Sequence, residues 1–394
     1  MSKLNYIRSL GVKAKKASEE LSVLSENKKN AVLKSFYLNI KQNVNKIIKA
    51  NKIDLVSSKK NKLKDNLIDR SMLNKERIQS ILNSIEEVIS FKDPTHKVIA
   101  KWKRPNNLII NRVTMPIGVL GVIYEARPNV TSDVAILSFK SGNSAILRGG
   151  KEALQSNIII SNLFRSSLKR NNINQDCIQL VNNTDRKIVD LMLSKMSDYI
   201  DIIIPRGGKS LVKKVLELSK VPTIGHLEGL CHVYLDNQYN YDIAEKLILN
   251  SKLRRTSICG AAETLLINKS VKKNDVYKIL QKLNIKGCKI IGDNKTKKIF
   301  EKTILAKEND WSTEYLDSKI SVKIVNDLKE AIQHIKKYGT NHTECIISKN
   351  KNNIKTFEKN ISSSIVMTNA STQFADGYEF GLGSEVGIST NKMH

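Results

Sequence analysis

The sequence predicts an α/β protein of two domains, each built on a mostly parallel sheet flanked by helices, with a small protruding hairpin. Three observations lead to this prediction. With 394 residues, the chain is longer than one ordinary hydrophobic core supports. Residues 1–92 contain one glycine and no proline, and their apolar residues recur at helical spacing. From Gly118 onward, strand-like and helix-like runs alternate, which is the order of parallel α/β sheets.

The N-terminal helices are expected to end shortly before the hairpin. Apolar residues at helical spacing cover 18–52 and again 71–91, with Lys and Asn between them. Asp93-Pro94 then stops the helical pattern, because a residue before proline disfavours the helical backbone. Strand-like residues follow on both sides of Pro105-Asn106-Asn107, so we predict a hairpin that turns at these three residues.

The alternating part of the chain divides into two α/β stretches. In the first we expect strands at 118–125, 143–150, 177–182 and 198–208, and helices at 131–142, 151–171, 185–196 and 209–220. The second stretch begins around Asp242, and its strand-like or helix-like runs lie at 241–253, 263–270, 276–284, 288–292, 321–339 and 343–348. A parallel sheet with helices on both faces is therefore expected in each stretch.

Composition excludes several classes of protein. No apolar run is long enough to span a membrane, so we expect no membrane partner. The five cysteines are scattered, without CxxC pairs, which favours a reducing cytoplasm over a disulfide scaffold. The net charge of +28 suggests nucleic acid, but only 13 of the 66 cationic residues are Arg and aromatics make up 5%. We therefore expect no nucleic-acid partner, and a surface that attracts anionic substrates and cofactors.

Two Gly-Gly turns are candidates for phosphate binding. Leu147–Glu152 and Pro205–Ser210 each join a predicted strand to a predicted helix and carry a lysine, and such junctions present free backbone N–H groups. The second resembles the end of a P-loop, but Ile203 stands where that motif needs its first glycine. No GxGxxG is present. A dinucleotide bound by another kind of turn and two ordinary strand–helix turns both remain open.

Cys259 is the best candidate for a nucleophile. Arg254 and Arg255 precede it and a Gly-Ala-Ala turn follows it, and nearby positive charge with free N–H groups favours the thiolate. The other four cysteines lie in apolar strand-like runs and are expected to be buried and inert. No metal site is predicted, because the six histidines show no HxxxH or His-plus-Cys spacing.

These residues carry a resemblance to a known family. The segment 115–157, which contains YEARPNVT and LRGGKEA, is similar to the γ-glutamyl phosphate reductases, a branch of the aldehyde dehydrogenase superfamily. The likeness extends through IIIPRGGKSL, VPTIGHLEGLCHVYLD, the Cys259 segment, WSTEYLD, IKKYGTNHTE and EFGLGSE, so that it covers the whole chain in order. It implies an aldehyde dehydrogenase-like fold of two α/β domains with an oligomerisation hairpin.

The resemblance implies a reaction in proline biosynthesis. A member of this family reduces L-glutamyl 5-phosphate to L-glutamate 5-semialdehyde with NADPH, through a thioester on Cys259, and releases phosphate. We expect Asn129 to act as a catalytic oxyanion donor, since Ala126 stands at the superfamily's usual Asn position. Arg127 and Arg255 are expected to contact the anionic substrate. Where aldehyde-oxidising relatives carry a water-activating Glu, this chain has His226.

The resemblance also implies a cofactor site. Arg148 and Lys151 stand where superfamily members contact the adenosine ribose, and two cations there favour the 2′-phosphate of NADP over NAD. Gly207, Gly208 and Ser210 are expected along the pyrophosphate and the nicotinamide. Glu314 is expected at the nicotinamide ribose.

The predicted layout has three parts. Residues 1–235 form an NADP-binding domain with a hairpin at about 96–115 for subunit contact, and residues 236–366 form the catalytic domain, with the active site between the two. Residues 367–394 form a segment that returns to the cofactor domain or the subunit interface, and we expect it to be truncated relative to the family. The resemblance further implies a homo-oligomer, dimer or tetramer, in the cytoplasm, and functional coupling to glutamate 5-kinase.

Departures from the family pattern leave two alternatives. The family's RPGVCNALETLLV is RTSICGAAETLLI here, with changes at Thr256, Ser257, Gly260 and Ala262. The first alternative is an aldehyde-oxidising NAD(P) dehydrogenase of another substrate, which requires a carboxylate that activates water near Cys259. The second is a catalytically impaired basic binding protein, which would show a steep salt dependence with nucleic acid.

Overall fold

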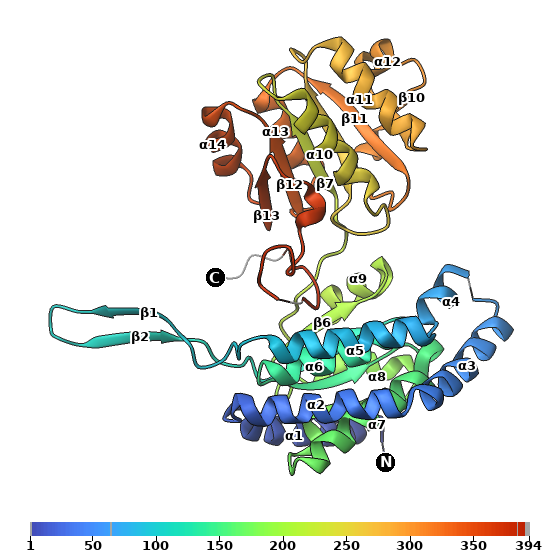
Figure 1. The fold of residues 1–394 in the computed structure, drawn as a ribbon, viewed down its shortest axis with the longest axis vertical. Helices are drawn as coiled ribbons and strands as arrows, with labels where there is room; N and C mark the ends of the chain where they lie inside the picture. The colour runs from blue at the N-terminus through green and yellow to red at the C-terminus, as the bar shows by residue number, and fades with distance from the viewer. Residues whose placement is uncertain (1, 64, 384, 391–394) are drawn as a thin grey trace. The chain divides into compact units, whose positions relative to one another are not determined.

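The chain folds into two compact units, shown in Figure 1. The computed structural model describes residues 2–63, 65–383 and 385–390. The first unit comprises Met1–Gly225 and the second comprises His226–His394. The predicted boundary after residue 235 therefore moves to 225, because the strand β7 (Cys231–Leu235) pairs with strands of the second unit.

The first unit is built on a parallel sheet. Its strands are β3 (Val119–Tyr124), β4 (Ser144–Arg148), β5 (Ile178–Leu180) and β6 (Ile202–Arg206), in the order β5-β4-β3-β6. The predicted strands of this stretch are confirmed. β3 and β4 are buried throughout, as expected for strands covered by helices on both faces. The strand order reverses between β3 and β6, which makes their carboxyl ends a topological switch point.

Helices cover this sheet and extend from it at the N-terminus. In α1, Ile7, Ala14 and Leu21 are buried, one heptad apart, so that a single helix face packs against the sheet core. The predicted helices before residue 92 and after residue 118 are confirmed. The helices of this unit are α1 (Lys3–Ser22), α2 (Glu26–Gln42), α3 (Val44–Lys60), α4 (Asp65–Ser71), α5 (Lys75–Ser90), α6 (Pro128–Lys140), η1 (Lys151–Ala153), α7 (Leu154–Arg170), η2 (Gln175–Cys177), α8 (Arg186–Lys195) and α9 (Lys209–Leu218).

The predicted hairpin is present and stands away from the body of the first unit (Figure 1). It consists of β1 (Val98–Lys103) and β2 (Ile109–Val113), which pair antiparallel. Asn107 has a φ of 66° in the turn, a left-handed conformation that asparagine tolerates better than most residues. Although the hairpin is exposed, it carries several apolar side chains: Val98, Ile99, Trp102, Leu108 and Ile109.

The second unit is built on a wider parallel sheet. Its strands are β7 (Cys231–Leu235), β8 (Ala262–Asn268), β9 (Lys289–Gly292), β10 (Ile304–Leu305), β11 (Lys319–Val325), β12 (Thr343–Ile347) and β13 (Ile365–Thr368), in the order β10-β9-β11-β8-β7-β12-β13. Along β7, Val233 and Leu235 belong to one core cluster and Tyr234 to the other, so both faces of the sheet are covered. Because β8, β7 and β12 are adjacent and parallel, their amino ends share one edge of the sheet.

Helices and a C-terminal segment complete the second unit. The helices are α10 (Tyr241–Leu253), α11 (Lys273–Ile285), α12 (Asn294–Ile299), η3 (Glu308–Ser312), α13 (Leu328–Tyr338), α14 (Lys351–Asn360) and η4 (Thr372–Phe374). The segment predicted to return to the other domain or to an interface bonds within this unit, where Gln373 Nε2 donates to the carbonyl of Ser251. Residues 384 and 391–394 of that segment lie outside the described residues. Within the described chain, no helix has both the length and the apolar character to span a bilayer.

Candidate active site

Cys259 lies in the loop between α10 and β8, and its side chain is partly exposed. The other four cysteines are buried, as the sequence predicts. Burial raises the pKa of Cys177 to about 12 and that of Cys288 to about 11, which suppresses their thiolates. Burial raises the pKa of Cys345 and of Cys231 for the same reason. All five cysteines are described, and among them Cys259 is the one whose side chain is not buried.

Close packing holds the Cys259 backbone in place. The Cys231 thiol donates a hydrogen bond to the Cys259 carbonyl oxygen at 3.0 Å. A Cβ added at Gly229 would lie 2.6 Å from the Cys259 Cβ, and one added at Gly260 would lie 3.1 Å from the Thr372 carbonyl oxygen. Gly260 replaces the asparagine of the family pattern, and its surroundings leave little room for a larger residue. The loop therefore depends on two glycines for its fit.

A buried ion pair joins the elements that flank this loop. Lys252 Nζ, on α10, lies 2.7 Å from Glu263 Oε2, on β8, and both side chains are fully buried. The Leu316 backbone N–H donates to the other carboxylate oxygen at 3.2 Å. Burial nevertheless raises the pKa of Glu263 to about 7. Removal of either partner would leave an unpaired charge in the core beside the loop that bears Cys259.

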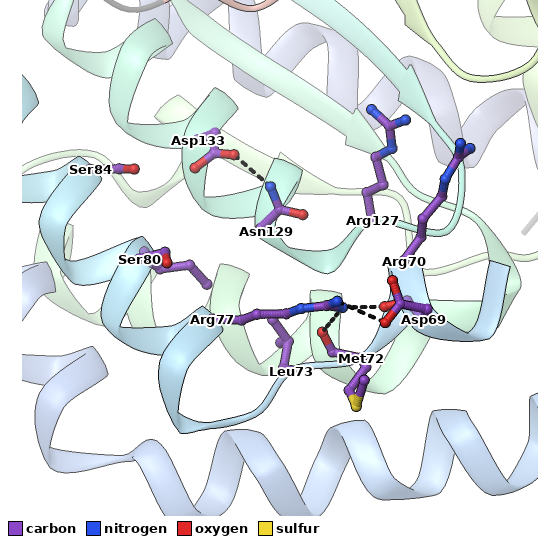
Figure 2. A pocket seen from close by; sticks show the side chains of 11 residues that line it. Asp69, Arg70, Met72, Leu73, Arg77, Ser80, Ser84, Arg127, Asn129 and Asp133 are labelled. Carbon is purple, nitrogen blue, oxygen red and sulfur yellow. Dashed lines mark hydrogen bonds and ion pairs between the residues drawn. The ribbon is translucent and has the colours of Figure 1, made fainter. Parts of the chain in front are cut away.

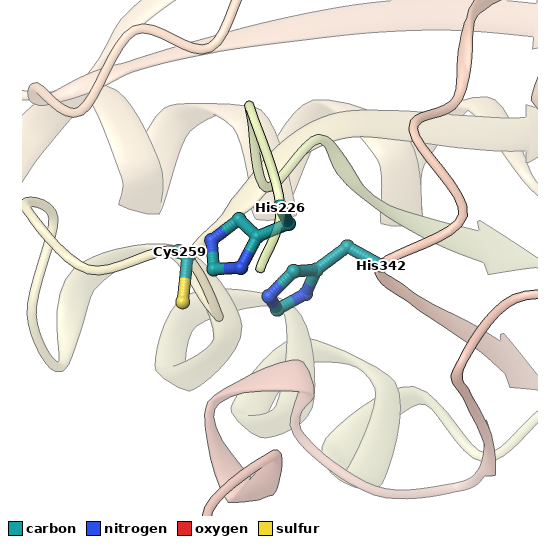
Figure 3. A group of neighbouring side chains, drawn as sticks. All are labelled: His226, Cys259 and His342. Atoms are coloured by element: carbon teal, nitrogen blue, oxygen red, sulfur yellow. The ribbon is translucent and has the colours of Figure 1, made fainter. Parts of the chain in front are cut away.

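Two imidazoles lie beside the Cys259 thiol, as Figure 3 shows. His226, His342 and Cys259 each offer one N or S atom within 4.8 Å of the others. His226 Nδ1 lies 2.7 Å from the Ile388 carbonyl oxygen. His342 was not singled out from the sequence, because it lies far from Cys259 along the chain. The three residues meet because β7, β8 and β12 are adjacent strands, and each residue lies shortly before the amino end of one of them.

A pocket in the first unit contains two of the predicted site residues. It encloses about 400 Å³ and is shown in Figure 2. Arg127 and Asn129 both line it. The remaining lining residues were not predicted, and they are Asp69, Arg70, Met72, Leu73, Arg77, Ser80, Ile81, Ser84 and Asp133.

The pocket carries an unpaired cation beside a partly buried acid. Among the described residues, no hydrogen bond or ion pair involves the Arg127 guanidinium, and burial and repulsion from Arg206 lower its pKa. Asn129 Nδ2 donates to Asp133 Oδ2 at 2.9 Å, and burial raises the pKa of Asp133 to about 6. Ala126, just before them, has a φ of 40°, a strained conformation of the kind that gathers at functional sites.

The predicted cofactor residues of the first unit follow the carboxyl ends of β4 and β6. The Arg148 guanidinium donates to the carbonyls of Gly149 at 2.7 Å and Thr184 at 3.0 Å. Lys151 and Ser210 are exposed. The Gly208 N–H donates to Glu125 Oε2 at 2.8 Å, so a carboxylate occupies the start of α9. A Cβ at Gly207 would lie 2.6 Å from that same oxygen.

Glu314 and Arg255 belong to the second unit. Glu314 Oε1 accepts a hydrogen bond at 3.0 Å from the N–H of Gly229, the glycine that packs against Cys259. Arg255 is exposed. Its neighbour Arg254 pairs with Glu379 at 2.9 Å and lies over the Phe374 ring, 5.7 Å from the centroid. Of the two arginines before Cys259, Arg254 therefore makes contacts within this unit, whereas Arg255 is the one predicted to bind substrate.

Comparisons with known proteins place this arrangement among named enzymes. The γ-glutamyl phosphate reductase of Parvibaculum lavamentivorans is 43% identical over 385 residues, which cover 98% of this chain and 91% of that protein. The crystal structure of γ-glutamyl phosphate reductase from Thermotoga maritima matches with a TM-score of 0.95 and 38% identity, covering 100% of this chain and 94% of that one. An acetylating aldehyde dehydrogenase from Geobacillus thermoglucosidasius shares the fold, with a TM-score of 0.64 and 16% identity over 99% of this chain and 94% of its own. No family model matches the chain.

Proposed function

The chain belongs to the γ-glutamyl phosphate reductase family, and from that premise we propose that it reduces L-glutamyl 5-phosphate to L-glutamate 5-semialdehyde through a thioester on Cys259. The observation that carries the proposal is the accessible thiol of Cys259, in a loop fixed by close packing, while the other four thiols are buried. The chain is thus an oxidoreductase of amino-acid biosynthesis with an aldehyde dehydrogenase-like fold.

The proposed chemistry follows from the thiol and its leaving group. The Cys259 thiolate attacks the acyl carbon, the C–O bond to phosphate breaks, and inorganic phosphate leaves with the electron pair. A nicotinamide cofactor, when bound, supplies the hydride that the thioester carbon accepts. The C–S bond of the resulting hemithioacetal then breaks, which releases the aldehyde and returns the thiolate. Asn129 stabilises the developing oxyanion, and Arg127 and Arg255 bind the anionic substrate.

We place the cofactor in the first unit and propose that it is NADP. The support is the switch point at the carboxyl ends of β3 and β6, where open α/β sheets bind ligands, together with the cations Arg148 and Lys151 after β4. Gly207, Gly208 and Ser210 are proposed along the pyrophosphate, which requires that Glu125 release the Gly208 N–H. Glu314 is proposed at the nicotinamide ribose. Equal kcat/KM with NADP and NAD would contradict this choice.

The residue beside the thiol argues against hydrolysis of the thioester. An aldehyde-oxidising enzyme needs a carboxylate there that activates water. His226 takes that place, and its Nδ1 is engaged with the Ile388 carbonyl. Glu263 is not available either, since it is paired with Lys252 in the core. The phosphate-releasing reaction is therefore the better supported one.

The reaction run backwards tests reaction and nucleophile together. Glutamate 5-semialdehyde, phosphate and NADP are supplied, and NADPH is followed by its absorbance. We expect NADPH formation that depends on phosphate and that disappears in Cys259→Ala. NADPH formation without phosphate would favour the aldehyde-oxidising alternative. A folded chain with no activity that binds nucleic acid with a steep salt dependence would favour the basic binding protein.

We further propose that the hairpin mediates self-association into a dimer or tetramer. Its support is the row of exposed apolar side chains on β1 and β2. Trp102→Glu is expected to lower the mass measured by light scattering, whereas an unchanged mass would contradict the role. Coupling to a glutamate 5-kinase fits the lability of an acyl phosphate, and co-sedimentation of the two proteins tests it. The free thiols fit a location in the cytoplasm.

A further inference from the structure

The group His226, Cys259 and His342 combines the ligand types of a zinc site. One atom from each residue lies within 4.8 Å of the others. In a tetrahedral zinc site the N and S ligands lie roughly 3.3–3.8 Å apart, given Zn–N and Zn–S bonds of about 2.0–2.3 Å. A contraction of about 1 Å is therefore needed, and the partly exposed side chains of Cys259 and His226 have the freedom to supply it.

The His342 ring nitrogen that points into this group has no other partner. His342 is fully buried, and its Nε2 makes no hydrogen bond with any described residue. Figure 3 shows the His342 ring directed toward His226 and Cys259. A buried nitrogen without a hydrogen-bond partner destabilises the folded state, and a ligand at this position would remove that cost.

The second nitrogen of each imidazole is already engaged. His226 Nδ1 lies 2.7 Å from the Ile388 carbonyl oxygen, which only accepts, so this nitrogen carries the proton and Nε2 keeps its lone pair. His342 Nδ1 lies 2.9 Å from Thr343 Oγ1. Metal-binding histidines typically donate their other N–H to such oxygens, which fixes the ring and the tautomer. The loop bearing His342 is itself held, since Thr340 Oγ1 accepts from the Leu230 N–H at 2.9 Å.

We propose that Zn²⁺ binds to His226, Cys259 and His342 as a reversible inhibitor, with its fourth position open to water. The Cys259 thiol releases its proton to solvent and the sulfur forms a bond to Zn²⁺. The sulfur lone pair then no longer attacks the acyl carbon. The inhibitory effect rests on the proposed role of Cys259, whereas the binding of metal does not. Structural zinc sites use four protein ligands, whereas a site with three protein ligands keeps one position open.

Metal binding is measured directly on the full chain. Co²⁺ is titrated first, because its bond to a thiolate gives a charge-transfer band, and Zn²⁺ is then used to displace it. We expect one equivalent per chain, loss of the band in Cys259→Ser, and roughly 100-fold weaker binding in His226→Gln and in His342→Gln, since even outer-shell partners contribute 10–100-fold. His96→Gln, an exposed histidine outside the group, should bind as tightly as the wild type.

The same variants separate this proposal from its competitors. Zn²⁺ should abolish turnover of the wild type, and a chelator should restore it. Wild-type Zn²⁺ affinity in folded His226→Gln would overturn the proposal, since His226 would then not be a ligand. Retention of one tight equivalent in Cys259→Ser would overturn it as well. Since His226 is partly exposed, its variant serves if His342→Gln does not fold, and the cobalt band is informative even for a chain without reductase activity.

Discussion

The two units use opposite edges of the same kind of sheet. In the first unit, the candidate residues follow the carboxyl ends of β3, β4 and β6, where Arg127, Lys151 and Gly208 lie. In the second unit, they precede the amino ends of β7, β8 and β12, where Cys259 and His342 lie. Both sheets are parallel, so the difference lies in which end of the strands carries the loops with chemistry.

The chemistry of each edge explains this division. A loop at a carboxyl end leads into a helix N-terminus and presents backbone N–H groups, which suit phosphates and other anions. A loop at the amino end of a strand follows a helix C-terminus, which has no free N–H groups, so the chemistry there depends on side chains. Cys259 follows α10, and His342 follows α13. We infer that recognition of anionic groups, those of the cofactor and of the substrate, is assigned mainly to the first unit and the nucleophile to the second.

Removal of the thiol should have the largest effect and test this division. Cys259→Ala is expected to lower kcat by about 10⁴-fold or more, because the nucleophile is lost. NADPH binding, followed by fluorescence, should be unchanged, since we assign it mainly to the first unit. Cys288→Ala, which removes a buried thiol of the same unit, should retain activity. Loss of cofactor binding in Cys259→Ala would show that the two roles are not separate.

The next effect concerns the buried pair beside the catalytic loop. Lys252→Met leaves the Glu263 carboxylate unpaired and should lower the free energy of unfolding by about 3–5 kcal/mol. The folded pKa of Glu263, about 7, exceeds its unfolded value of about 4.3, so the folded state binds more protons between these values. The contribution of Glu263 to the free energy of unfolding therefore falls as the pH rises from about 4.3 to about 7.

Urea unfolding at several pH values measures how much stability Lys252→Met loses relative to the wild type. The difference in the free energy of unfolding should be smallest near pH 5, where Glu263 is protonated, and largest above pH 7. The double variant with Glu263→Met should recover most of the stability, because a buried pair replaced by apolar groups is often neutral. A loss that does not change with pH would show that packing of the lysine stem, rather than the charge, dominates.

A smaller effect is expected from the glycine that packs against the thiol. Gly229→Ala places a Cβ within 2.6 Å of the Cys259 Cβ, so the loop must shift. A displacement of about 1 Å is expected to lower kcat roughly 100-fold. Gly287→Ala, at a glycine with no neighbour within 4 Å of the added Cβ, is the control for an added methyl group that meets no neighbouring atom, although its positive φ adds a strain that Gly229 lacks. Its kcat should be unchanged, and equal losses in both variants would rule out a local cause.

The smallest of these effects lies in the pocket of the first unit. Arg127→Gln should raise the KM for the acyl phosphate about 10–100-fold, the value of a charge-assisted hydrogen bond, with less change in kcat. The rate at which iodoacetamide alkylates Cys259 should stay the same. Arg77→Gln is the matched control, because Arg77 lines the same pocket but pairs with Asp69 at 2.9 Å. A similar rise in KM for Arg77→Gln would remove the special role of Arg127.

Much of the fold, but less of the site, could be predicted from the sequence. Periodicity and turn residues located the strands of the first unit and the hairpin turn at Asn107, because these signals are local. The boundary between the two units was placed after residue 235 because the sequence of Cys231–Leu235 predicts a strand but does not indicate which of the two sheets that strand joins. His342 was missed because its proximity to Cys259 depends on tertiary packing. Asp133 was missed because the predicted helix began at 131, whereas α6 begins at Pro128 and places Asn129 one turn before Asp133. Likewise, nothing in the sequence shows that Arg148 donates to two backbone carbonyls.

The assembly of the thiol site from β7, β8 and β12 has a consequence for biosynthesis of the chain. Cys259 leaves the ribosome well before His342, and the three loops meet only after strands distant in sequence have paired. Such long-range pairing is slow compared with helix formation. Until it is complete, the four thiols of the second unit are exposed to oxidants, and afterwards only that of Cys259 is partly exposed. The number of cysteines that a short pulse of alkylating reagent modifies therefore reports how far the second sheet has formed in the nascent chain.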